Sequence, residues 1–365
     1  MNANAFVTLA LITTAAVGLA VATSAYSGVS DAIADRGEAV APGLRNQAQG
    51  VTRIEVDAGD GPMVFERKDG AFRDISGFPA KPSVARELIA GLAVMTIEER
   101  RTDDPKRYAE LDLAKPGLAG GGDGITLKGA SGNVIADVVV GDRDATVGGT
   151  RGGQFVRRGG EPQTYLARGS ITPPVSRAEW FETSLANIKP AELAVVFATA
   201  EGENRFSFTR SATGLTLADL PPGRAVDPAK VQQLERLIAP LRFADVRAAE
   251  KDAAAPKVPV LTARTADGLT LQIALVDPVK PDQPTDVRWV RVSAEAAKDN
   301  EAAQKRAQAI NARTGGFAFK LTADDTRLLS YNVADFLTQD EAAPQNSSPS
   351  NAATPPTAPA TPSAQ

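Results

Sequence analysis

Val64-Phe65-Glu66-Arg67-Lys68-Asp69-Gly70-Ala71-Phe72 is the stretch that decides the fold, because a similar pattern returns later in the chain. Phe206-Ser207-Phe208-Thr209-Arg210, followed by Gly214-Leu215, echoes it, and each stretch leads through a proline-marked turn into an apolar helical segment. Each then reaches a Gly-centred hairpin and a matching tripeptide, Phe155-Val156-Arg157 in the first case and Trp289-Val290-Arg291 in the second. A repeat of this size can bury a core of its own, so the pattern predicts duplicated domains.

Two periodicities outline each repeat. Apolar and polar residues alternate at the strand period from Val51 to Val56, and Asp69-Gly70 marks a hairpin turn. The helical period appears at Val84, Leu88, Leu92 and Met95, and again at Val231, Leu234, Leu237, Ile238 and Leu241 after the capping pair Asp227-Pro228. We therefore expect an α+β fold with two tandem copies of a mixed module of short antiparallel strands with a packed helix, preceded by one N-terminal hydrophobic helix.

Composition and motif order place the boundaries. We expect residues 1–30 to form a transmembrane anchor or signal segment, 31–50 a connector, 51–188 the first repeat module and 189–338 the second. Residues 339–365 consist mainly of Ala, Pro, Ser and Thr, a composition that predicts a disordered tail. We interpret Trp180 as a plug between the two modules.

The absence of histidine and cysteine from the 365 residues excludes many mechanisms. A Ser-His-Asp or Cys-His nucleophile, a Cys or His zinc site and a histidine acid/base all need residues that this chain lacks. The formal net charge of −4, with no basic stripe interleaved with aromatics, argues against nucleic acid as a partner. We expect no cofactor and no enzymatic activity.

The N-terminal segment bears on localisation. No charged side chain occurs in residues 1–30, and the apolar run of residues 5–25 is long enough to cross a hydrocarbon core of roughly 30 Å as a helix. We expect an uncleaved single-pass anchor in the inner membrane, with the bulk of the chain in the periplasm. One alternative is a signal peptide cleaved after the small residues Thr23-Ser24-Ala25, and another is a buried core helix.

Three polar motifs are candidates for chemistry or binding. The Gly-rich residues 117–124 precede a strand, whereas a phosphate-binding loop opens a helix, so they predict a flexible hairpin entry. Asp142-Arg143-Asp144 contains the best local pair of carboxylates for acid/base catalysis. Charged residues this close in sequence more often form a solvated turn. Arg151, Arg157 and Arg158 form a possible interaction patch that would grip a carboxylate of a partner or an anionic glycan; ordinary surface charge is the alternative.

Several short motifs also occur in a characteristic order. They are Pro42-Gly43-Leu44 before Ile54-Glu55-Val56, Phe65-Glu66-Arg67 followed by Gly70, Tyr108-Ala109-Glu110-Leu111-Asp112-Leu113 with Pro116, Gly132 with Val140-Gly141, Gln154-Phe155-Val156-Arg157, Tyr165-Leu166-Ala167, Trp180, and Phe317-Ala318-Phe319-Lys320-Leu321. In this order and spacing, nearly the whole chain up to about Leu337 resembles the domain of unknown function 4340 family. The resemblance implies a membrane-anchored extracytoplasmic protein associated with ABC-transporter components related to gliding motility and auxiliary exporters. The resemblance implies no catalytic or ligand-binding residues for this chain.

Three hypotheses for function follow. The first is a non-enzymatic, membrane-tethered periplasmic accessory or scaffold protein of an ABC-type transporter complex, with integral-membrane transporter subunits as partners. The second is a soluble periplasmic glycan- or peptide-binding protein that holds its ligand between the two modules. The third is a hydrolase that uses carboxylates alone. Co-purification separates the first two, because a scaffold retains membrane partners and a binding protein retains a small ligand.

Overall fold

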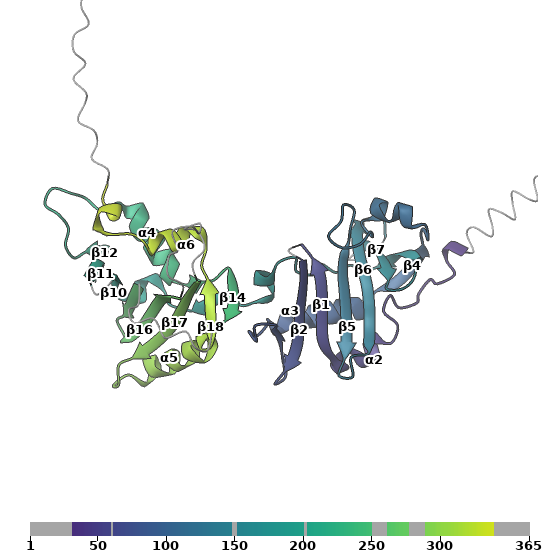
Figure 1. Cartoon of the computed structure of the whole chain (residues 1–365), viewed down its shortest axis with the longest axis horizontal. Helices are drawn as coiled ribbons and strands as arrows, with labels where there is room; N and C mark the ends of the chain where they lie inside the picture. The colour runs from purple at the N-terminus through teal and green to yellow at the C-terminus, as the bar shows by residue number, and fades with distance from the viewer. Residues whose placement is uncertain are drawn as a thin grey trace, which may run out of the picture.

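The structure, a computed structural model, describes residues 31–59, 61–147, 152–200, 203–249, 261–276 and 289–338. The N-terminal hydrophobic helix expected in residues 1–30 and the tail expected in residues 339–365 both lie outside this range. Within it, no helix is both long and apolar enough to span a membrane. The described chain forms two large sheets and a few helices, an α+β architecture drawn out along one long axis (Figure 1).

The first half of the chain builds an eight-stranded antiparallel sheet in the order β3-β2-β1-β5-β6-β7-β8-β4. Its strands are β1 (Val51–Ala58), β2 (Gly61–Lys68), β3 (Ala71–Asp74), β4 (Thr96–Arg100), β5 (Asp123–Gly129), β6 (Val134–Asp144), β7 (Gly153–Arg158) and β8 (Thr164–Arg168). Its helices are α2 (Leu44–Gln47), α3 (Pro82–Val94) and the 3-10 turns η1 (Ala48–Gly50) and η2 (Pro105–Leu111). The expected hairpin turn is confirmed between β2 and β3, where Asp69 and Gly70 both adopt positive φ.

The second half builds another eight-stranded sheet in the order β12-β11-β10-β15-β16-β17-β18-β14. Its strands are β10 (Leu193–Ala200), β11 (Glu203–Ser211), β12 (Gly214–Leu217), β14 (Asp245–Ala248), β15 (Leu261–Thr265), β16 (Leu269–Leu275), β17 (Trp289–Ala296) and β18 (Phe317–Lys320). Its helices are α4 (Pro228–Ile238), α5 (Glu301–Thr314), α6 (Ala323–Leu328) and the 3-10 turns η4 (Pro190–Glu192) and η5 (Val333–Phe336). Numbered within its own half, each sheet has the strand order 3-2-1-5-6-7-8-4.

Helices α3 and α4 follow the third strand of their respective sheets, where the sequence period predicts them. Helix α3 buries Ala85, Leu88, Ile89 and Leu92 on one face. Helix α4 begins as expected, because the carboxylate of Asp227 accepts a hydrogen bond from the backbone N–H of Ala229 at 2.8 Å. Helix α5 was not predicted; it lies between β17 and β18 and packs on β16 and β17.

The residues between β8 and β10, which we call the linking segment, join the two sheets. This segment contains the 3-10 turn η3 (Arg177–Trp180) and the strand β9 (Ser184–Ala186). Strand β9 pairs with β13 (Leu241–Arg242), which belongs to the second half. The buried apolar residues of both halves also form one continuous cluster, so the core does not stop at the boundary between the sheets.

Backbone on either side of the first sheet pairs with its outermost strands. On β4, the N–H of Gly37 donates to the carbonyl of Ile97 at 2.8 Å, and the N–H of Ile97 donates to the carbonyl of Glu38 at 2.8 Å. On β3, the N–H of Ala80 donates to the carbonyl of Phe72 at 2.8 Å. The expected connector therefore lies against β4 over residues 37–40, and the chain after β3 turns back onto that strand.

Candidate functional site

The junction between the two sheets is built around the carboxylate of Asp74, at the end of β3. One oxygen, Oδ1, accepts hydrogen bonds from the backbone N–H groups of Ser76 at 3.1 Å and Phe78 at 3.0 Å, and from the Ser76 hydroxyl at 2.6 Å. Only 3% of this side chain is exposed. A buried carboxylate is strongly disfavoured unless it is hydrogen-bonded and paired, so its remaining oxygen needs a cationic partner.

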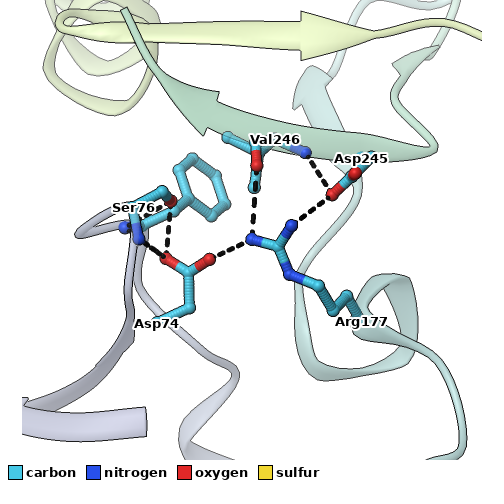
Figure 2. Close-up of polar contacts among 6 residues, drawn as sticks. Asp74, Ser76, Arg177, Asp245 and Val246 are labelled. Atoms are coloured by element: carbon cyan, nitrogen blue, oxygen red, sulfur yellow. Dashed lines mark hydrogen bonds and ion pairs between the residues drawn. The ribbon is translucent and has the colours of Figure 1, made fainter. Parts of the chain in front are cut away.

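Arg177 of η3 supplies that cation. Figure 2 shows its guanidinium between Asp74 of the first half and Asp245 of the second. One Nη2 hydrogen bond goes to Oδ2 of Asp74, and Nη1 donates to Oδ1 of Asp245 at 2.9 Å. Nη2 also donates to the carbonyl of Val246 on β14 at 3.3 Å. The planar guanidinium group of Arg177 thus holds the end of β3 against β14.

An aromatic cluster fills the space beside this ion pair. The ring of Phe78 lies 5.3 Å from that of Phe181 in the linking segment, and 5.5, 5.1 and 5.7 Å from those of Phe243, Phe317 and Phe319 in the second half. All four contacts are edge-to-face, the geometry that aromatic quadrupoles favour. Phe78 is fully buried. The junction therefore has an apolar centre beside its charged clamp.

Trp180 is buried, but its role differs from the one expected. Its ring stacks on Phe65 of β2 at 4.1 Å, within the first half of the chain. Phe78 and Phe181, and not Trp180, are the rings that meet Phe243 of the second half. The aromatic contact between the two halves is therefore made by Phe181 of the linking segment and by Phe78, which follows β3.

A cleft of about 560 Å³ opens next to this junction. It lies between the linking segment, β13 and α5. Its lining residues are Glu182, Ser184, Leu185, Asn187, Ile188, Pro240, Arg242, Arg306, Ala309, Ile310 and Arg313. A cleft of this size with an apolar wall and a few polar groups is typical of small-molecule sites. We call it the arginine cleft, after Arg242, Arg306 and Arg313.

Arg306 is neutralised by carboxylates. Its Nη2 lies 2.8 Å from Glu192 and its Nη1 lies 2.7 Å from Asp267. A hydrogen bond from the Thr265 hydroxyl, together with the nearby Arg306 charge, lowers the pKa of Asp267 below its usual value. Arg306 therefore belongs to an ion-pair network that fixes α5 to η4 and to the β15–β16 turn.

Arg313 and Arg242 are in a different position. The Arg313 guanidinium donates to the carbonyl of Glu182 and lies 5.7 Å from the centre of the Phe78 ring. Its Nε is covered and has no acceptor in the described part of the chain. Burial lowers the pKa of Arg313. Arg242 makes one long hydrogen bond, 3.4 Å, to the Thr183 hydroxyl. Neither guanidinium has a carboxylate within ion-pairing distance among the residues that the structure describes.

The predicted arginine patch is divided. Arg151 lies outside the described residues. Arg157 lies over the ring of Tyr108, with its guanidinium carbon 5.0 Å from the ring centre. Arg158 lies 5.2 Å from the ring centre of Tyr165 and donates to the carbonyls of Ala39 at 2.8 Å and Val40 at 3.1 Å, with 14% of its side chain exposed. The fork of Arg158 thus holds the connector to the sheet.

Asp142 and Asp144 interact with different neighbours. The Asp144 carboxylate accepts a hydrogen bond from the backbone N–H of Thr146 at 2.7 Å and stabilises a turn, as the structural alternative predicts. Asp142 instead lies near Asp112, and burial together with this neighbouring charge raises the pKa of Asp112. Across the described chain, no group of three or more acidic side chains is arranged to hold a metal ion.

The Gly-rich stretch serves close packing. A Cβ atom on Gly121 would lie 2.3 Å from the carbonyl oxygen of Lys115, and one on Gly122 would lie 2.3 Å from the carbonyl oxygen of Asp112. Side chains do not fit at these distances, which explains why glycine occupies both positions. The stretch leads into β5, as expected of a hairpin entry.

The residues that form the junction and the cleft were not predicted. The ion pair of Asp74 and Arg177 joins positions 103 residues apart, and no local pattern links them. A signal existed for α5, because Asn300 is a good N-cap and its side chain accepts a hydrogen bond from the N–H of Ala303 at 3.1 Å. Recognising that helix would have placed Arg306 and Arg313 on it.

Comparison with known proteins bears on this site. The model of a family described as a domain of unknown function (DUF4340) matches residues 74–259. The matched range contains Asp74, Arg177 and Asp245, all three side chains of the charged clamp, but not α5. No curated protein matches the chain. No solved structure matches it either.

Proposed function

The chain belongs to the DUF4340 family, and from this premise we propose that it is a non-enzymatic, membrane-tethered periplasmic accessory protein that acts as a scaffold in an ABC-type transporter complex. The resemblance to this family implies an extracytoplasmic setting beside transporter components. Integral-membrane transporter subunits are the partners of this proposal.

The two halves are, in this proposal, tandem copies of one module. The shared strand order and the helix after the third strand of each sheet support a duplication. Helix α5 is then an addition to the second copy, because residues 159–163 alone join β7 to β8 in the first. Duplication gives a scaffold two related surfaces on one chain.

The junction is the observation that carries the proposal. Arg177 links both sheets through side chains, and Phe78 inserts among three rings of the second half. Two modules fixed in this way present their surfaces at a set distance and angle, whereas modules on a flexible linker would not. A fixed geometry suits a protein that positions other subunits.

The N-terminal segment supplies the tether. Residues 5–25 contain no charged side chain and are about long enough to span a bilayer. Many of them are Ala, Gly and Thr, which contribute little individually to insertion, so a small number of charges would be enough to abolish it.

The arginine cleft supports the second candidate, a periplasmic protein that binds a small ligand beside the junction. The two candidates differ in what stays with the purified protein. A scaffold retains membrane subunits, and a soluble binding protein retains a ligand and no membrane partner.

The test is affinity purification of the full chain from detergent-solubilised membranes, followed by mass spectrometry. We expect the protein to resist carbonate extraction and to co-purify with transporter membrane subunits. Changing Leu11 and Leu19 together to Lys should release it and abolish that co-purification, because each charge at a helix centre disfavours insertion by about 2.5–3.5 kcal/mol.

A matched control places the same two charges outside the apolar run. Changing Gln47 and Gln49 together to Lys adds two positive charges beyond residues 5–25 and should leave extraction unchanged. The scaffold proposal fails if the mature protein begins near Tyr26, occurs free in the extracytoplasmic fraction and brings down no membrane subunit.

A further inference from the structure

We propose that the arginine cleft binds a small ligand that carries an oxyanion, either a carboxylate or a phosphate, together with an apolar part. This site is independent of the tether and of any transporter partner. It is a binding function for a specific set of residues: Arg242 and Arg313 for the oxyanion, and Leu185, Ile188 and Ile310 for the apolar part.

The guanidinium of Arg313 is the first reason. It is partly buried, with its charge held against the Phe78 ring and a backbone carbonyl, and no carboxylate of the described chain lies within ion-pairing distance of it. Its covered Nε has no acceptor among these residues. Cations in such a position are normally paired, and arginine forks pair bidentately with carboxylates and phosphates.

Arg242 is the second reason, because it lines the same cleft and, like Arg313, has no carboxylate within ion-pairing distance among the described residues. Strand β13 holds it opposite Ser184 of β9, and the one hydrogen bond described for its guanidinium is the 3.4 Å contact with Thr183. A long, neutral contact leaves most of the donors of an exposed guanidinium directed to solvent. Two guanidinium groups that have no ion-pairing carboxylate in the described part of the chain therefore line one cleft of about 560 Å³.

Two other charged side chains line the cleft and limit its positive electrostatic potential. Arg306 is already paired with Glu192 and Asp267, so it adds little positive potential. Glu182 is an acid on the rim, and its Oε1 accepts a weak hydrogen bond from the N–H of Ser184 at 3.4 Å. Its charge opposes the binding of an anion, which makes it a useful test position.

Part of the cleft lining is apolar. Leu185 is 3% exposed, Ile188 is 2% exposed and Ile310 is 8% exposed, and all three line the cleft with Pro240 and Ala309. A hydrocarbon segment attached to the oxyanion would itself leave water against these side chains, at a gain of about 0.8 kcal/mol for each of its methylenes that is buried.

Ligand-observed nuclear magnetic resonance on the full chain in detergent tests the site, with acetate, hexanoate and inorganic phosphate as separate probes at constant ionic strength. We expect all three to bind competitively, and hexanoate to bind more than about tenfold tighter than acetate. Phosphate binding tighter than acetate indicates a phosphate-bearing natural ligand, and the reverse indicates a carboxylate; either result supports the site.

Variants assign the binding to the cleft. Arg313→Gln and Arg242→Gln should each weaken hexanoate and phosphate by about tenfold or more, the loss expected for a charge-assisted hydrogen bond. Glu182→Gln should strengthen both anions. Arg236→Gln, which changes an exposed arginine of α4 that does not line the cleft, is the matched control and should change neither.

Three results would overturn the proposal: no binding by any probe, equal binding by the parent and the Arg242→Gln variant, or hexanoate binding no tighter than acetate. Arg242→Gln carries the test if Arg313→Gln fails to fold, because Arg242 is exposed and lies outside the aromatic cluster. All measurements use purified protein, so failure of the transporter proposal would not affect their outcome.

Discussion

At the scale of single residues, the carboxyl groups of Asp112 and Asp142 are an unfavourable pair. Burial and the adjacent Asp142 charge raise the pKa of Asp112 above its ordinary value. Asp112 also adopts a φ of 50°, a left-handed conformation that is uncommon outside glycine but that asparagine and aspartate tolerate better than most residues. The electrostatic repulsion of the two carboxylates therefore opposes folding, and removing one charge should relieve it.

We expect Asp142→Asn to raise the free energy of unfolding at pH 7 by roughly 0.2–1 kcal/mol, the range for solvent-screened charge pairs. An acid whose folded-state pKa is raised opposes folding while it is ionised, and this penalty disappears as the pH falls through that pKa. The gain should therefore be present at neutral pH and vanish in acid. Urea denaturation at pH 7 and near pH 3 measures it.

The control is Asp144→Asn, which removes a nearby negative charge with a different role. Hydrogen bonds from the hydroxyl and N–H of Thr146 lower the pKa of Asp144, so its charge stabilises the fold above the unfolded-state pKa. Asp144→Asn should bring no gain at pH 7. A gain of equal size in both variants would mean that net charge, and not the Asp112–Asp142 pair, is responsible.

At the scale of elements, η3 is short but connects three parts of the molecule. Its four residues include Arg177, which contacts β3 and β14, and Trp180, whose carbonyl accepts a hydrogen bond from the N–H of Lys81 at 2.7 Å just before α3. A 3-10 turn of this length has little stability of its own. Its conformation is therefore set by these tertiary contacts.

Arg177→Met should lower the free energy of unfolding by about 2–3 kcal/mol. The substitution keeps the apolar stem but leaves the Asp74 carboxylate buried without a cation, which costs roughly 3–5 kcal/mol in fully buried pairs. We expect less here because 32% of the Arg177 side chain is exposed. Guanidinium denaturation measures the difference.

Two further variants decide whether the clamp acts through Asp74. Asp245→Asn should cost less than Arg177→Met, because 34% of the Asp245 side chain is exposed against 3% for Asp74. Adding Asp74→Asn to Arg177→Met should recover part of the lost stability. If Arg177→Met unfolds at the same denaturant concentration as the parent, the ion pair is not a clamp.

Local patterns predicted the elements better than they predicted the site. The helical period and the Asp227 cap predicted α3 and α4, because these signals depend on residues a few positions apart. Helix α5 escaped because it buries mainly small side chains, Ala303, Ala307 and Thr314 with Ile310, and so lacks a marked apolar stripe. The arginine cleft escaped for the same reason, since two of its arginines lie on that helix.

At the scale of the whole molecule, the two sheets share one buried core. The cluster runs without interruption from Val40 in the connector to Phe336 in η5 and includes Phe78 and Phe181 at the junction. Two domains joined only by a linker would unfold independently. A continuous core and a charged clamp predict that these two halves unfold together.

The two tryptophans, Trp180 and Trp289, report on opposite sides of the junction. Two variants, each with one tryptophan changed to Phe, allow the other tryptophan to be followed alone. We expect the fluorescence of Trp180 and that of Trp289 to give thermal transitions with the same midpoint. Adding Phe78→Ala to each variant should separate these two transitions. It should also lower the free energy of unfolding by about 3–5 kcal/mol, because it removes a buried ring from the junction.

Phe336→Ala is the control. Phe336 is as fully buried as Phe78, but its ring contacts, Phe206, Phe208 and Tyr331, all lie in the second half. It should lower the midpoint and leave the two signals coincident. Separate transitions in the parent chain would contradict a shared core.

The strand and helix patterns predicted an α+β architecture, and the described chain has one, with two eight-stranded sheets of the same strand order. That the two sheets are tandem copies of one module stays a prediction. The contact between them was only partly foreseen. Trp180 marked the linking segment, but the rings that cross the junction, such as Phe78 and Phe319, come from distant parts of the sequence. Such contacts depend on how the two folded halves pack against each other. The periodicity of the sequence within one half does not predict that packing.

The pairing of residues 37–40 with β4, and of Ala80 with β3, limits how the first sheet can recognise another protein. Many proteins bind an extended peptide by adding it as one more strand at an open sheet margin. Both margins of this sheet already carry backbone from the same chain. A partner of the first half therefore has to be recognised through side chains and surface shape, and an extended peptide would first have to displace the connector or the turn before α3.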